Sequence, residues 1–191
     1  MNHTTFEIVR AQAQDAAALL EYLKIVGGET ENLSFGAEGV PIDVEAERSY
    51  LDMQTQSCDH IQLLAKANGE IIGTASLNRK KNRMSHRAEF GISVKKEWWG
   101  CGVASTLTEH ILDFARKTGV EQINLEVRSD NNRAIALYKK FGFRKLCTFP
   151  GFFKINGALV DFDFMNLEIY STMQDEETAE NTAGMTLLGI L

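Results

Sequence analysis

Two glycines separated by one residue, Gly100 and Gly102, follow an apolar segment and precede a helix-forming run in this 191-residue sequence. Glycine lets a backbone turn tightly and approach a ligand closely. A helix beginning there leaves its first amide N–H groups unpartnered, and such groups bind phosphate together with the helix dipole. The pattern therefore predicts a diphosphate site, although a plain turn between a strand and a helix has the same pattern.

The same glycines approach the G-x-G-x-x-G pattern of dinucleotide-binding folds. Ser105 replaces the third glycine of the pattern. Glu126 lies about 20 residues after the motif, where dinucleotide-binding folds carry an acidic residue that binds the ribose. Such folds usually begin with the motif, whereas about 90 residues precede it here. We therefore keep dinucleotide binding only as an alternative to a diphosphate site of another kind.

Hydrophobic periodicity predicts the elements that position these residues. Strands are expected at 6–10, 60–67, 71–77, 88–94 and 122–127 and on each side of Asn156-Gly157, and helices at 15–28, 43–56, 103–117 and 132–140. Asp15 is expected to cap the first helix, Gly27-Gly28 to end it, and Asn68-Gly69 to form a hairpin turn. This order predicts a mixed α/β fold with one β-α-β unit in the middle.

Two segments in this order resemble the GNAT N-acetyltransferase superfamily. LEVRSDNNRAIALYKKFGF, at 125–143, is similar to the family's strand, asparagine-containing turn and helix of the form AI-LY-K-GF. Gly102 and Ala104 match its acetyl-coenzyme A loop, (Gln/Arg)-x-x-Gly-x-(Gly/Ala), in which Trp99 replaces Gln or Arg. The resemblance spans 6–169 and implies the acyl-CoA N-acyltransferase fold, a twisted sheet of about seven strands flanked by about four helices.

This resemblance implies acetyl-CoA as cosubstrate and no metal. The strands at 88–94 and 122–127 would diverge, which leaves backbone groups of Ile92 and Val94 free to bond the pantetheine arm. Asn131 matches an asparagine that bonds this arm, although it could simply stabilise its turn. The expected diphosphate loop consists of Trp99, Gly100, Cys101, Gly102, Val103, Ala104 and Ser105. Cys101 is expected to be a small filler and not a nucleophile.

The resemblance also suggests the catalytic groups. Tyr138 matches the family's tyrosine that gives a proton to the departing thiolate, and a phenol is protonated at neutral pH; a core aromatic is the alternative. Glu126 stands where relatives similar to ribosomal-protein N-terminal acetyltransferases carry a catalytic glutamate, with Glu89 as the rival base. An amide near Val94 is the expected donor to the oxyanion.

The acceptor is expected between the loop at 27–40 and the final hairpin. Glu29, Glu31 and Phe35 are candidates on one side, and Phe153, beside Phe152, on the other. A peptide N-terminus is favoured by the Leu-Glu-Val-Arg strand, and a small amine by the acidic loop. A coenzyme A-binding module without catalysis is the alternative from another class.

Composition narrows the remaining function classes. The net charge of −6 disfavours nonspecific nucleic-acid binding, and no apolar run approaches the roughly 20 residues that cross a bilayer. Neither a secretory signal nor CxxC spacing is evident, so we expect a reducing, cytoplasmic location. One basic cluster, at 79–87, is either a solvated loop or a mouth that attracts an anionic cofactor.

The chain is expected to hold one acetyltransferase domain, 1–170, followed by a polar, acidic tail at 171–191. The tail ends in MTLLGIL and either docks or is disordered. A homodimer is compatible with the sequence, which does not determine the oligomeric state.

Overall fold

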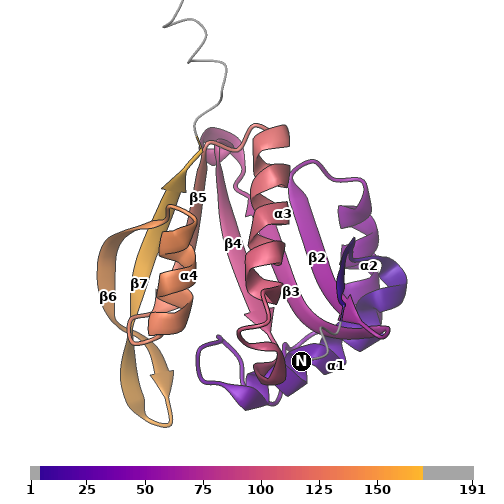
Figure 1. The fold of residues 1–191 in the computed structure, drawn as a ribbon, viewed down its shortest axis with the longest axis horizontal. Coiled ribbons are helices and arrows are strands. Elements are labelled where there is room, and N and C mark those ends of the chain that lie inside the picture. The colour runs from indigo at the N-terminus through magenta and orange to yellow at the C-terminus, as the bar shows by residue number, and fades with distance from the viewer. Residues whose placement is uncertain (1–4, 170–191) are drawn as a thin grey trace, which may run out of the picture.

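A seven-stranded mixed sheet organises the protein, in the order β1-β2-β3-β4-β5-β7-β6 (Figure 1). The computed structural model describes residues 5–169, so the expectations for the tail at 171–191 lie outside the described residues. Neighbouring strands are antiparallel except β4 and β5, which are parallel. The predicted order of strands and helices is confirmed.

The strands are β1 (Glu7–Arg10), β2 (His60–Ala67), β3 (Glu70–Arg79), β4 (Arg87–Val94), β5 (Gln122–Arg128), β6 (Arg144–Ile155) and β7 (Ala158–Glu168). The helices are α1 (Ala16–Glu29), α2 (Val44–Thr55), α3 (Val103–Lys117) and α4 (Asn132–Lys140). Three short 3-10 turns, η1 (Ala13–Asp15), η2 (Asn82–Met84) and η3 (Lys96–Trp98), were not predicted. No helix among residues 5–169 has the length and apolar character needed to cross a bilayer.

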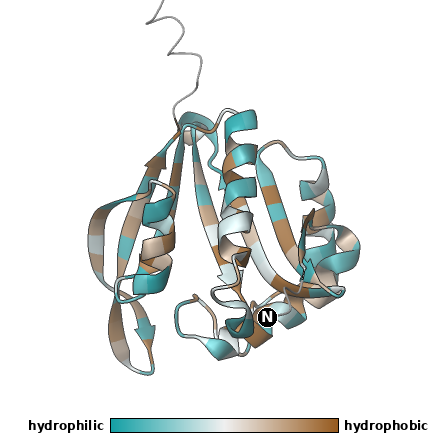
Figure 2. Ribbon diagram, viewed as in Figure 1, coloured by the Kyte–Doolittle hydropathy of each residue, from teal (hydrophilic) through white to brown (hydrophobic). Residues whose placement is uncertain are grey.

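Helices cover both faces of the sheet because strand side chains alternate between them. Leu63 and Ala65 of β2 belong to the core beneath α3 and α4, whereas Leu64 belongs to the core beneath α1 and α2. Hydrophobic and hydrophilic segments alternate along the strands and helices (Figure 2). The sheet is therefore packed on both faces, and this packing positions the residues at its strand ends.

The two Asn-Gly turns form as their sequence dictates. Asn68 and Gly69 have φ of 50° and 83°, and Asn156 and Gly157 have φ of 49° and 85°. Positive φ at both central residues is the turn that matches the twist of a β-hairpin. The hairpin turn predicted at Asn68-Gly69 is confirmed.

Asp15 is the N-cap residue of α1, as predicted, whereas the prediction that Gly27-Gly28 ends this helix was wrong. The helix continues through Gly27-Gly28 to Glu29, because Gly27 serves close packing and does not stop the helix. An added Cβ on Gly27 would lie 2.0 Å from the carbonyl oxygen of Gly36. Asp15 lies in η1 and accepts from the Gln12 amide at 2.9 Å, so it does not cap α1 with its side chain.

Strands β4 and β5 diverge after a short pairing, as predicted. They pair only at Arg87/Gln122, Ala88/Ile123 and Glu89/Asn124. The Lys95 amide donates to Ile72 of β3, so the alternating backbone groups of Ile92 and Val94 face the diverging side. The end of β4 thus offers hydrogen-bonding groups that β5 does not use.

Candidate active site

A cavity of about 640 Å³ lies where β4 and β5 diverge. Glu89 and Glu126 face away from the core that contains Tyr138, yet all three residues line this cavity. The cavity therefore passes between the strands and joins the two faces of the sheet. Its lining also includes Ile92, Val94, Trp99, Gly100, Gly102, Val103, Ala104, Ser105, Asn131 and Phe153.

One end of the cavity is a cradle of unbonded amides at the start of α3. Gly100 and Gly102 have φ of 84° and 88°, which turn the chain sharply into the helix. The α3 N-cap makes no side-chain hydrogen bond, and no acidic residue occupies the first turn. Among residues 5–169, the amides of Gly100, Gly102, Val103, Ala104 and Ser105 find no acceptor. Such a cradle suits an anion.

Cys101 does not share this environment. Its amide donates to the Trp98 carbonyl at 3.3 Å, which closes a tight turn, and its side chain is exposed. The expectation of a small filler was wrong, because this turn directs Cys101 away from packed surroundings. It does not line the cavity.

Trp99 fastens the loop to the end of β4. Its indole Nε1 donates to the Val94 carbonyl at 2.8 Å, so one of the backbone groups expected to be free is partnered. The Arg133 guanidinium carbon lies 5.0 Å from the centroid of the Trp99 ring. The residue that departs from the family's loop pattern therefore contacts both β4 and α4.

Asn131 begins α4 at the cavity wall. Its side-chain oxygen accepts from the Ala134 amide at 3.2 Å and caps the helix. Capping uses the oxygen only, so the side-chain amide nitrogen has no partner among residues 5–169, and Asn131 lines the cavity. The two interpretations of Asn131 are therefore compatible.

Tyr138 of α4 is buried between Phe90 and Phe143, with ring centroids 6.2 Å and 5.8 Å away. Burial raises the pKa of Tyr138 well above its ordinary value, so the phenol holds its proton at neutral pH. Its hydroxyl makes no hydrogen bond within residues 5–169, which leaves the proton free for a group in the cavity.

Glu126 is exposed at the cavity, two residues beyond the last β4–β5 pair. Partial loss of water raises the pKa of this carboxyl, the charge of Glu89 raises it further, and Lys80 acts in the opposite direction. Glu89 is ion-paired with Lys80. A carboxylate with a raised pKa is the better base, and of the two acids Glu126 is the one without an ion pair among the described residues.

Substitutions of Glu89 and Lys80, the two charges next to Glu126, should shift the pH dependence of activity in opposite directions. A base works when deprotonated, so activity should rise through the pKa of Glu126 as pH increases. Glu89→Gln should move this acidic limb to lower pH, and Lys80→Met to higher pH, measured as kcat/KM against pH. Glu126→Gln should remove the limb. An unchanged limb in Glu126→Gln would assign it to another group.

The family model described as Acetyltransferase (GNAT) family matches residues 30–143. The chain belongs to the GNAT acetyltransferase family. An L-amino acid N-acetyltransferase of Escherichia coli is 36% identical over 106 residues, 54% of this chain and 65% of that protein. The N-alpha-acetyltransferase RimI of Mycobacterium tuberculosis is 34% identical over 95 residues, 49% of this chain and 58% of RimI. These matches therefore span somewhat less than two thirds of each relative.

Solved structures agree with this fold. A GNAT-family acetyltransferase from Streptococcus pneumoniae has a TM-score of 0.83 and 28% identity, covering 86% of this chain and all of that one (100%). A putative acetyltransferase from Salmonella typhimurium, solved with its cofactor acetyl-CoA, has a TM-score of 0.75 and 22% identity, covering 86% of this chain and 94% of that one. At 22% identity the second match speaks for the fold alone.

The expected acceptor residues of this GNAT chain occupy different surroundings. Phe153 lines the cavity, whereas Glu29, Glu31 and Phe35 do not. Glu29 accepts from the Lys96 amide at 2.8 Å and so holds the turn before the glycine-rich loop. Phe35 packs against the core beneath α1 and α2.

Glu31 connects three segments that are far apart in the sequence. Its carboxylate lies 3.4 Å from Arg128 of β5 and accepts from Asn156 of the final hairpin at 3.1 Å. These contacts bridge the loop after α1 to the β6–β7 turn. Glu31 therefore ties the loop after α1 to β5 and to the final hairpin.

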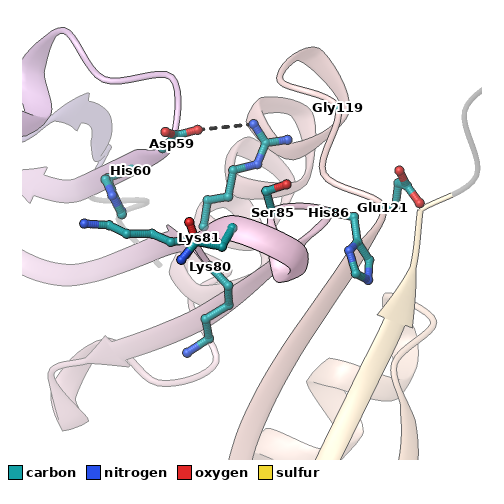
Figure 3. A pocket seen from close by; sticks show the side chains of 10 residues that line it. Asp59, His60, Lys80, Lys81, Ser85, His86, Gly119 and Glu121 are labelled. Atoms are coloured by element: carbon teal, nitrogen blue, oxygen red, sulfur yellow. Dashed lines mark hydrogen bonds and ion pairs between the residues drawn. The ribbon is translucent and has the colours of Figure 1, made fainter.

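The basic cluster at 79–87 lies at the opposite end of β4 from the glycine-rich loop. The cluster ends at Arg87, the first residue of β4, whereas the glycine-rich loop follows Val94, and an eight-residue strand spans roughly 25 Å. Some of its residues line a separate cavity of about 520 Å³ (Figure 3). There Arg79 pairs with Asp59 at 3.2 Å. This separation favours the alternative of a solvated loop over that of an entrance for the cofactor.

Several lining residues were not predicted. Leu33 and Phe162 form apolar walls, and Arg133 adds a cation beside the amide cradle. Arg133 follows the asparagine of the recognised motif by two residues, which was the available signal. Leu33 lies in a loop without a pattern, so only the three-dimensional structure identifies it.

Proposed function

We propose that this protein is an acetyl-CoA-dependent N-acetyltransferase that acts on a primary amine, either a small molecule or a peptide N-terminus. One observation carries the proposal: a single cavity joins an amide cradle to an acid and a buried phenol on two diverging strands and a helix. The names of the two relatives specify an L-amino acid and an N-alpha position, which favours an α-amine as acceptor.

The residues present fit coenzyme A. The unbonded amides from Gly102 to Ser105 suit its diphosphate, and the diverging backbone of β4 suits the amides of its pantetheine arm. A Cβ added to Gly102 would meet nothing within 4 Å, so this position opens toward the ligand space. When bound, acetyl-CoA supplies an activated thioester.

The side chains then have separate tasks. A free amine with a pKa near 10 is mostly protonated at pH 7, so Glu126 accepts its proton directly or through a water. The Val94 amide, which faces the diverging side, donates to the developing oxyanion. Tyr138 holds the proton that the leaving thiolate needs.

A coenzyme A-binding module without catalysis is the second candidate. A screen of amino acids, amines and peptides that follows thiol release from acetyl-CoA separates the two. The proposal expects release that depends on one class of amine. Binding of coenzyme A without release for any amine would establish the module. The exposed, unpaired cysteines at 58, 101 and 147 suit the cytoplasmic location that we also propose.

Breaking the Glu31 bridge should change which acceptors enter. Glu31→Ala is expected to raise kcat/KM for peptides relative to free amino acids by roughly two- to fivefold, because exposed ion pairs are weak. Glu45→Ala, which breaks an exposed pair with Arg48 on α2, is the control and should leave the ratio unchanged. An equal loss for every acceptor would instead mean that Glu31 contacts the amine itself.

A further inference from the structure

Arg133 is an unpaired cation at the amide cradle. It projects from the first turn of α4 and lines the cavity. Within the described residues it has no carboxylate partner, whereas Arg128 nearby is paired with both Glu31 and Asp130. Its Nη2 atom lies 3.6 Å from the position that a Cβ on Gly100 would take.

Trp99 holds this guanidinium in place. The ring centroid lies 5.0 Å from the guanidinium carbon, and the indole is itself fixed by its hydrogen bond to Val94. A planar guanidinium stacked on an aromatic face is ordered before a ligand arrives, and it keeps N–H donors free at its edge. These donors match two oxygens of a phosphate.

We infer that Arg133, seated on Trp99, provides the cationic contact to the diphosphate of coenzyme A. The inference rests on the proposed function. The loop carries Trp99 where its family pattern has Gln or Arg, so the polar side chain is missing from the loop itself. Arg133 brings a charge to the same place from another helix, beside the free amides of Gly100 and Gly102.

The test measures binding by titration calorimetry, with coenzyme A, dephospho-coenzyme A and pantetheine as probes. Arg133→Ala should weaken the binding of coenzyme A and of dephospho-coenzyme A by the same factor, roughly 10- to 100-fold, since a hydrogen bond to a charged group is lost. Pantetheine, which lacks the diphosphate, should bind equally to both proteins. Turnover at saturating acetyl-CoA should be retained while KM rises.

Substitution of Trp99 tests whether its ring positions Arg133. Trp99→Leu should reproduce most of the loss, and adding it to Arg133→Ala should cost little more, because both act through one contact. Lys140→Ala is the control: it removes a cation that lies 5.3 Å from the Phe141 ring at the other end of α4. It should leave all three affinities unchanged.

Each outcome has a definite meaning. If the unaltered protein binds no coenzyme A, the proposed function fails. If it binds and Arg133→Ala binds equally well, only the role of Arg133 fails. If Arg133→Ala lost affinity for coenzyme A but not for dephospho-coenzyme A, Arg133 would contact the 3′-phosphate, and its assignment to the diphosphate would be overturned. An equal loss for pantetheine would show a merely structural role.

Discussion

Replacing Gly102 with valine should abolish measurable binding of acetyl-CoA, raising Kd at least about 100-fold. Gly102 has a φ of 88°, a conformation that a β-branched residue adopts only with strain. Its Cβ would also point into open space beside the amides that should hold the diphosphate. Strain and obstruction act together, and calorimetric titration measures the result.

Gly69→Val is the matched control for this prediction. Gly69 has a φ of 83°, and an added Cβ would meet nothing within 4 Å, but it lies in the β2–β3 turn. Both variants should lose a similar stability, about 1–3 kcal/mol, in thermal unfolding. Only Gly102→Val should lose the ligand. Micromolar affinity in that variant would contradict the assignment of the loop.

Tyr138→Phe should lower kcat by about 100- to 10,000-fold, the range expected for loss of a general acid. Phenylalanine keeps the packing against Phe90 and Phe143, and the hydroxyl has no hydrogen bond to lose within residues 5–169. Thermal stability and the Kd for acetyl-CoA should therefore stay the same. Steady-state kinetics with the best acceptor from the amine screen measures the effect.

Tyr22→Phe is the control for Tyr138→Phe. Tyr22 is also buried, but its hydroxyl bonds the Ser93 hydroxyl at 3.0 Å and does not line the cavity. This variant should lose about 1 kcal/mol of stability from one hydrogen bond while kcat changes little. Equal kcat in Tyr138→Phe and the unaltered protein would remove Tyr138 from the role of acid.

Local signals explain what the sequence could predict. The Asn-Gly turns, the acidic first turn of α2 and the glycine-rich entry to α3 each depend on a few neighbouring residues, and each forms as expected. The divergence of β4 and β5 followed from the family resemblance. These features fix the cradle and the strand ends, which is why much of the candidate site could be outlined.

Contacts between distant segments explain the rest. Gly27 lies inside α1 because the carbonyl of Gly36 approaches it, and no pattern within the helix reveals this approach. The contacts of Trp99 with Arg133 and of Glu31 with Asn156 likewise join segments far apart in sequence. Tertiary packing thus decides which loop residues line the cavity and which brace its walls.

A crystal structure of the full chain grown with coenzyme A would test the central claim most directly. We expect the diphosphate to accept hydrogen bonds from the amides between Gly102 and Ser105, and the pantetheine arm to lie along β4 at Ile92. Density for the ligand elsewhere, or an empty space between β4 and β5 at saturating concentration, would contradict the account.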